Sequence, residues 1–186
     1  DSGKKTVLVS GGSRGARSIN RAMIDVLKNA AQHPQVQFLH ATGKGEYEDV
    51  MARLKAAGVD LEQCRHIRVC PYLYNMPQAM AIADLAVFRA GATGIAELTA
   101  KGIPAVLIPY PYAAENHQEY NARALEDAGA ARMILNKDLT AERLSSVLTE
   151  LLSEDMKLER MSRASRQLGR PQAAEVIADM ALAIAK

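Results

Sequence analysis

The sequence predicts an α/β fold, a Rossmann-like parallel sheet flanked by helices. Short runs rich in β-branched residues alternate with longer segments of helical periodicity, which is typical of parallel strands joined by crossover helices. Hydrophobic residues make up 48% of the 186 residues and charged residues 24%, which suits a packed core and excludes a disordered chain. Because no linker, repeat or low-complexity tract divides the chain, we expect a single domain over residues 1–186.

Each expected strand is a short apolar run bounded by turn residues. In chain order the strands are Thr6–Ser10, Val36–Ala41, Ile67–Cys70, Leu85–Phe88, Ala105–Ile108 and Arg132–Ile134. The helical periodicity between and after them predicts helices over Ser18–Ala31, Glu46–Ala57, Met76–Ala83, Ile95–Lys101, Gln118–Ala128, Thr140–Leu152, Asp155–Leu168 and Pro171–Ala185. Three glycines follow helical segments where a left-handed C-cap requires glycine, namely Gly58, Gly102 and Gly129. Pro171 suits a first helical position.

Composition excludes several classes of function. A net charge of +2 and an aromatic content of 4% without tryptophan are not those of a nucleic-acid-binding protein. Cys64 and Cys70 cannot form a disulfide framework and lack the spacing of a zinc site, so we expect a cytoplasmic protein without a metal. No apolar run is long enough to cross a membrane. The apolar segment Val176–Ala185 is expected to be an amphipathic helix on a protein surface.

The N-terminus begins at Asp1 without an initiator methionine or a signal-type segment and leads straight into a strand. We therefore expect the chain to be a piece of a longer protein.

Parallel sheets bind ligands at the carboxyl ends of their strands, which directs attention to the loops that follow them. The first loop, Ser10–Arg17, is rich in glycine and leads into a helix. Its glycines let the backbone approach a ligand, and free N–H groups at a helix start favour an anion. Ser13 could add a hydroxyl donor to a phosphate oxygen. The loop is neither a dinucleotide fingerprint nor a P-loop, and an ordinary tight turn is the alternative interpretation.

A second loop, Phe88–Glu97, also places small residues at the start of a helix. Its free N–H groups can face a phosphate. Glu97 lies about one turn into that helix, where its carboxylate can accept two hydrogen bonds from a ribose diol. Alternatively, a glutamate is simply favoured near a helix N-terminus by the helix dipole.

A third loop, Pro109–Asn121, collects amides, an imidazole and carboxylates at a helix start, which suits recognition of sugar hydroxyls. His117 has no partner carboxylate at a fixed spacing, so the pattern does not indicate a general base. Two further loops are ambiguous. His40–Gly45 is either a phosphate-facing loop or a plain turn, and Pro71–Pro77 is either an apolar wall for a flat base or part of the core.

Taken together, three motifs resemble the bacterial MurG family of glycosyltransferases. They are Gly11–Asn20, Arg89–Ala92 with Glu97, and Pro109–Pro111 followed by Asn116–Ala122. These enzymes transfer N-acetylglucosamine from UDP-N-acetylglucosamine to lipid I, which forms lipid II in peptidoglycan synthesis. The resemblance covers the C-terminal, donor-binding half of their GT-B architecture. It implies that an N-terminal domain for lipid I is missing, and that the parent enzyme is peripheral on the cytoplasmic face of the membrane.

The resemblance also implies roles for individual residues. The diphosphate would face Gly12, Ser13, Arg14 and Gly15, and the α-phosphate the N–H groups of Ala92, Thr93 and Gly94. Glu97 would hold the ribose, the Leu73 backbone the uracil edge, and His117 with Gln118 the N-acetylglucosamine. Two positions depart from the family, which often has Gln at Arg14 and a hydroxyl residue at Gly94.

The implied chemistry is an inverting transfer without a covalent intermediate, a metal or another cofactor. The general base is attributed to the missing domain, so we expect no catalytic residue here and a fragment that binds donor but is inactive alone. Two alternatives stay open. One is a single-domain subunit that works with a separate membrane-anchored partner, as in eukaryotic dolichol-linked sugar transferases. The other is a non-catalytic nucleotide-binding module.

Overall fold

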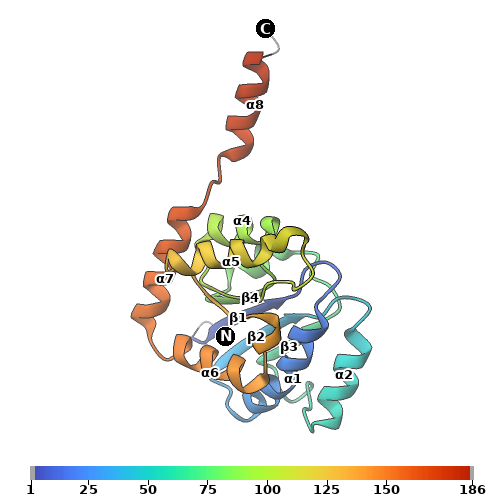
Figure 1. Cartoon of the computed structure of the whole chain (residues 1–186). Coiled ribbons are helices and arrows are strands. Elements are labelled where there is room, and N and C mark those ends of the chain that lie inside the picture. The colour runs from blue at the N-terminus through green and yellow to red at the C-terminus, as the bar shows by residue number, and fades with distance from the viewer. Residues whose placement is uncertain (1–2, 185–186) are drawn as a thin grey trace.

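The computed structural model describes residues 3–184 and is built around a parallel sheet of six strands (Figure 1). The strands are β1 (Lys5–Ser10), β2 (Val36–Ala41), β3 (Ile67–Cys70), β4 (Leu85–Phe88), β5 (Ala105–Leu107) and β6 (Ala131–Met133). Their spatial order is β3-β2-β1-β4-β5-β6, and every neighbouring pair is parallel. From β1 the chain adds β2 and β3 on one side, and it then crosses to add β4, β5 and β6 on the other side of β1. The boundary between the neighbouring strands β1 and β4 is therefore the switch point of a doubly wound fold.

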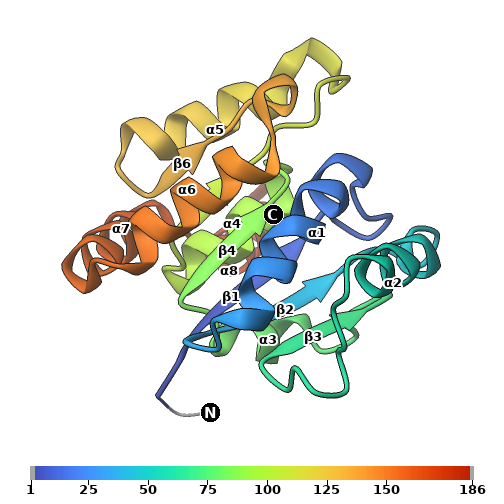
Figure 2. The same cartoon turned by 90° about the horizontal axis from the view of Figure 1, so that it is seen from below.

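Helices cover both faces of the sheet (Figure 2). One face carries α1 (Arg17–Gln32), α2 (Tyr47–Ala56) and α6 (Ala141–Leu152), and the other carries α3 (Met76–Ala81), α4 (Ala92–Lys101) and α5 (His117–Asp127). The helix α7 (Asp155–Leu168) packs beside α4 and α6. Short 3₁₀ turns, η1 (Ala114–Asn116) and η2 (Asn136–Asp138), precede α5 and α6. The α/β class and the flanked parallel sheet are therefore confirmed.

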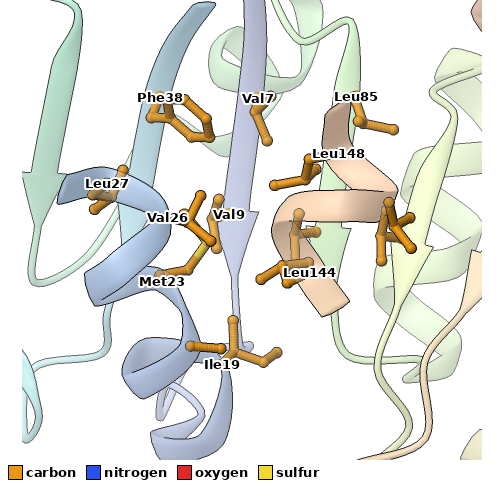
Figure 3. Close-up of a cluster of buried hydrophobic side chains, with 14 of the residues drawn as sticks. Val7, Val9, Ile19, Met23, Val26, Leu27, Phe38, Leu85, Leu144 and Leu148 are labelled. Atoms are coloured by element: carbon orange, nitrogen blue, oxygen red, sulfur yellow. The ribbon is translucent and has the colours of Figure 1, made fainter. Parts of the chain in front are cut away.

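The central strand β1 is buried on both faces, because its side chains alternate between two apolar clusters. Val7 and Val9 point into the cluster under α1 and α6, where they meet Ile19 of α1 and Leu144 of α6 (Figure 3). Leu8 belongs to the opposite cluster under α3, α4 and α5. Burial on both faces holds the carboxyl end of β1, and the loop that follows it, in a fixed place.

Helix boundaries agree with the sequence within a few residues. The largest early start is at α4, which begins at Ala92, three residues before the expected Ile95. The low helix propensity of Gly94 favours a later start in a prediction from sequence. In the structure Gly94 lies in the first turn, where the N–H groups have no partner within the helix. Gly58, Gly102 and Gly129 have φ values of 81°, 68° and 75°, which confirms the left-handed caps.

The last helix, α8 (Ala173–Ile184), corrects two expectations. It begins two residues after Pro171, so the proline precedes the helix instead of opening it. None of its residues is buried, and it projects from the body of the domain instead of packing on it (Figure 1). The helix α7 ends at Gly169, whose extended backbone angles interrupt the helical path, and residues 170–172 separate it from α8. Ala185, the expected last residue of this helix, lies outside the described residues.

Candidate functional site

A cleft of about 1120 Å³ opens at the carboxyl edge of the sheet, above the switch point between β1 and β4. Segments that follow all six strands contribute to its lining: Gly11–Ser18 after β1, Gly43 after β2, Pro71–Leu73 after β3, Arg89 and Gly91–Gly94 after β4, Tyr110–Tyr112 after β5, and Asn136 after β6. Ligands of doubly wound sheets bind at this place, where loops and helix N-termini meet. The cleft is therefore the candidate site.

The glycine-rich loop after β1 packs directly against the loop after β2. A Cβ atom on Gly15 would lie 1.9 Å from the carbonyl oxygen of Thr42, and one on Gly43 would lie 2.4 Å from the carbonyl oxygen of Arg14. Gly15 also has a φ of 78°, a conformation that residues with a side chain rarely adopt. These glycines let the two loops touch through their backbones, and they set the shape of the cleft floor.

Two helix N-termini, those of α1 and α4, point at the cleft. The first-turn N–H groups of α4 belong to Ala92, Thr93 and Gly94, and all three residues line the cleft. The first intrahelical bond of α4 runs from the N–H of Ile95 to the oxygen of Gly91, so the preceding N–H groups are left for a ligand. Gly12, Ser13 and Arg14 line the opposite wall beside the start of α1. Both walls favour an anion.

Polar groups for a sugar or ribose come from α4 and α5. Glu97 is exposed and lines the cleft from α4. Gln118 lines it from the first turn of α5, and its Oε1 accepts a hydrogen bond of 2.9 Å from the N–H of Tyr110. That bond orients the Gln118 side chain and leaves its amide N–H groups free to donate.

His117 does not line the cleft, although Gln118 beside it does. The His117 ring is exposed, and its Nδ1 lies at hydrogen-bond distance, 2.8 Å, from the carbonyl oxygen of Ala114. The turn before it is unusual, because Glu115 and Asn116 both have left-handed backbone angles, with φ of 50° and 55°. Left-handed non-glycine residues cost about 1–2 kcal/mol each, and such outliers gather at functional sites. The sugar-contacting role of His117 stays a prediction.

The segment that follows β3 forms part of the cleft wall. Leu73 and Tyr72 line it, and the Tyr72 ring lies edge-on to Tyr74, with ring centres 5.0 Å apart. The ammonium of Lys44 lies 5.8 Å from both ring centres. Tyr72 is exposed and Leu73 is half-buried, so the segment forms a wall of the cleft and not only part of the core. A flat base could lie against it.

Arg89 belongs to one of the three sequence motifs, but the sequence did not reveal which groups its side chain contacts. It is half-buried, lines the cleft and lies between β4 and α4. Its Nη1 donates to the carbonyl oxygens of Ile108 and Pro109 and to Asn136 Oδ1, at 3.0–3.1 Å for the carbonyls and 2.9 Å for the amide. Its Nη2 donates to Ser18 Oγ at 2.8 Å. Burial lowers the pKa of Arg89 from its ordinary value, and the guanidinium remains charged at neutral pH.

Buried hydrogen bonds hold the segment His40–Gly45 in place. His40 is fully buried, its Nε2 lies 3.0 Å from Asn20 Oδ1, and Asn20 Nδ2 donates to the Thr42 oxygen at 2.9 Å. Since Asn20 Oδ1 can only accept, Nε2 of His40 carries the proton. Burial lowers the pKa of His40 to about 4. His40 therefore acts as a neutral donor that ties β2 to α1 and holds the loop over the glycines.

Neither a membrane-spanning helix nor a metal-binding cluster is present within residues 3–184. No helix there is long and apolar enough to cross a membrane. Those residues also contain no group of three or more His, Cys, Asp or Glu side chains that could hold a metal ion.

A doubly wound sheet with a glycine-rich loop and two helix N-termini around one cleft is the architecture typical of nucleotide-binding α/β domains. The chain belongs to the family described as the glycosyltransferase family 28 C-terminal domain, whose model matches residues 6–177. The fold is that of the C-terminal domain of GT-B glycosyltransferases.

Similar proteins agree with this family. A UDP-N-acetylglucosamine--N-acetylmuramyl-(pentapeptide) pyrophosphoryl-undecaprenol N-acetylglucosamine transferase of Desulforamulus reducens is 50% identical over 170 residues, covering 91% of this chain and 46% of the relative. A transferase of the same name from Desulfitobacterium hafniense is 51% identical over 177 residues, covering 95% and 48%. The crystal structure of Acinetobacter baumannii MurG matches with a TM-score of 0.81 and 30% identity, covering 95% of this chain and 51% of that one.

These matches confirm the resemblance to the MurG family. The chain spans about half the length of the curated relatives it matches.

Proposed function

We propose that this chain is the donor-binding part of an inverting glycosyltransferase that moves N-acetylglucosamine from UDP-N-acetylglucosamine to lipid I. The observation that carries the proposal is the cleft itself. It combines two helix N-termini with Glu97 and Gln118, in a chain 50% identical to a transferase named for this reaction. The proposed partner for lipid I is an N-terminal domain of the parent protein, placed on the cytoplasmic face of the membrane.

In the proposed complex the diphosphate lies between the starts of α1 and α4. It takes hydrogen bonds from the N–H groups of Ala92, Thr93 and Gly94 on one side, and from Ser13 and its neighbours on the other. Glu97 accepts bonds from the ribose hydroxyls, and the backbone of Leu73 pairs with the uracil edge. Gln118, already oriented by Tyr110, donates to the sugar.

The reaction proposed for the parent enzyme is a single displacement. The muramyl C4 hydroxyl of lipid I attacks C1 of N-acetylglucosamine, the bond from C1 to the diphosphate oxygen breaks, and UDP leaves with the electron pair. The hydroxyl proton goes to a base on the acceptor side. This chain contributes by positioning the donor and by stabilising the charge that develops on UDP, and the proposal includes no resident cofactor.

Titration calorimetry with UDP tests the proposal. Unaltered protein should bind UDP at concentrations below the millimolar range, and Glu97→Ala should weaken binding about 10- to 100-fold because a charge-assisted bond is lost. Glu48→Ala on α2, outside the cleft, is the matched control and should bind normally. Absence of binding at millimolar UDP would contradict the proposal, as would full affinity in Glu97→Ala.

The ribose assignment has a sharper test with 2′,3′-dideoxy-UDP. If Glu97 holds the diol, the unaltered protein should bind this analogue about as weakly as Glu97→Ala binds UDP. Glu97→Ala should bind the analogue with the same affinity as it binds UDP. Additive losses would mean that Glu97 acts elsewhere.

A further inference from the structure

We infer that Arg89 is the charge-compensating residue of the donor site: its guanidinium is held between the N-termini of α1 and α4, where it positions and neutralises the diphosphate. The inference rests on the proposed function and adds a specific side chain to it. The backbone N–H groups of the glycine-rich loop and of the helix starts supply only partial positive charges, whereas a bound diphosphate carries several negative ones.

The place of Arg89 follows from its contacts. It comes directly before α4 in the chain, and its Nη2 donates to Ser18 Oγ in the first turn of α1. Ser18 Oγ in turn donates to Asn136 Oδ1 at 2.7 Å, which also accepts from Nη1 of Arg89. This closed triangle fixes the guanidinium beside both helix starts, where the two anion-favouring walls of the cleft meet.

The electrostatics point to an anion. Every hydrogen-bond partner of Arg89 within the described residues is neutral, namely two carbonyl oxygens, an amide oxygen and a hydroxyl. No carboxylate in that part of the chain forms an ion pair with it. A half-buried charge without a counter-charge is unfavourable, so the domain retains a site that an anion would complete.

Other arginines at the cleft are arranged differently. Arg17 already forms an ion pair with Glu46, at 3.0 Å. Arg14 is exposed and forms no ion pair among residues 3–184. Arg89 alone among these lining arginines is anchored by several elements, and the ring of Tyr110, 5.6 Å from its guanidinium carbon, covers it. A preorganised fork binds a phosphate with less loss of side-chain freedom than a flexible arginine does.

The Arg89 guanidinium keeps two N–H groups that could bind two phosphate oxygens. A guanidinium has five N–H groups, and the contacts above use those of Nη1 and one of Nη2. The N–H of Nε and the second N–H of Nη2 have no partner within residues 3–184. Because the Arg89 side chain lines the cleft, we infer that these two N–H groups donate to phosphate oxygens.

The test compares ligands that differ only in phosphate. UDP, UMP and uridine are titrated against the unaltered protein, Arg89→Gln and Arg89→Lys, by calorimetry or ligand-observed NMR. Arg89→Gln should weaken UDP about 10- to 100-fold and leave uridine within about threefold. Arg89→Lys should lose less UDP affinity than Arg89→Gln, because it keeps the charge. Arg160→Gln, an exposed position on α7 outside the cleft, controls for the change in net charge.

A second measurement is the salt dependence of UDP binding, which should be shallower in Arg89→Gln than in the unaltered protein. If Arg89 is only structural, UDP and uridine will weaken by the same factor, and that result overturns the inference. Unchanged UDP affinity also overturns it. If Arg89→Gln does not fold, Arg89→Lys decides: a selective loss of UDP supports the inference, and an equal loss of both ligands refutes it. Failure of the unaltered protein to bind UDP would instead contradict the proposed function.

Discussion

Gly15 offers a stringent test of how the cleft floor is built. Gly15→Ala adds a methyl group at a position where the Cβ would lie 1.9 Å from the Thr42 carbonyl oxygen. The clash is with backbone, so no side-chain rotation relieves it, and the loop after β1 must move away from the loop after β2. The residue must also keep a φ of 78°.

The expected cost has two parts. A side chain in the left-handed region costs about 1–2 kcal/mol. Forcing extra atoms into a close-packed place costs about 1–3 kcal/mol more. The free energy of unfolding should therefore fall by about 2–5 kcal/mol. For a domain of this size the melting temperature should fall by about 5–15 °C.

Two other glycines separate the parts of this cost. Gly12 has a φ of 90° with nothing within 4 Å of its Cβ position, so Gly12→Ala should show only the conformational cost, about 1–2 kcal/mol. Gly45 has open space and no left-handed angle, so Gly45→Ala should be neutral or slightly stabilising.

Urea and thermal unfolding followed by circular dichroism measure the three variants. The expected order of destabilisation is Gly15→Ala, then Gly12→Ala, then Gly45→Ala. If Gly15→Ala is no less stable than Gly12→Ala, the backbone contact between the two loops does not hold in solution and the reasoning is wrong.

Further predictions concern buried and capping residues. Since burial lowers the pKa of His40 to about 4, the unfolded chain binds its proton first as the pH falls. About 3 kcal/mol of stability, fully present above pH 6.5, should therefore be lost as the pH falls towards 4. In urea unfolding measured at several pH values, His40→Gln should lose less stability between pH 6.5 and 4 than the unaltered protein does, whereas the exposed His33→Gln should behave like the unaltered protein. If the free energy of unfolding of His40→Gln falls as steeply with pH as that of the unaltered protein, the assignment to His40 is wrong. Thr140→Ala removes the bond from the Arg143 N–H to Thr140 Oγ1 that caps α6 and should cost about 1 kcal/mol in urea unfolding, with Thr140→Ser as a near-neutral control. Leu144→Ala, in the core, should cost about 2–5 kcal/mol by the same assay, whereas Ile177→Ala on exposed α8 should stay within about 0.5; similar values would contradict the burial of α6 or the exposure of α8.

Much of the fold was predictable because strand and helix periodicities are local properties. The continuous apolar run Val7, Leu8 and Val9 is typical of a strand buried on both faces, and Gly102 predicts a helix end because glycine tolerates the left-handed φ that the structure shows there. The site was largely predictable for a topological reason. In a parallel sheet all carboxyl ends lie on one edge, so glycine-rich loops after β1 and β4 must come together.

The contacts that decide the role of individual side chains were not predictable from the chain. Arg89 is a loop residue in the sequence, yet its partners are Ser18, the carbonyls of Ile108 and Pro109, and Asn136. These partners lie up to 71 residues away in the sequence, and only the strand order places them around one guanidinium.

The exposed helix α8 also shows that the sequence predicts an element but not its surroundings. Its apolar residues predict a helix, and α8 is one, but composition cannot say which surface a helix meets. The sequence by itself determined the α/β class, the elements and the gathering of the anion-facing loops, because these depend on local periodicity and on the direction of parallel strands. Only the tertiary structure decided that Gly15 touches Thr42, that Arg89 lies between two helix starts and that His117 does not line the cleft. Those outcomes depend on distances between atoms that are remote in the chain.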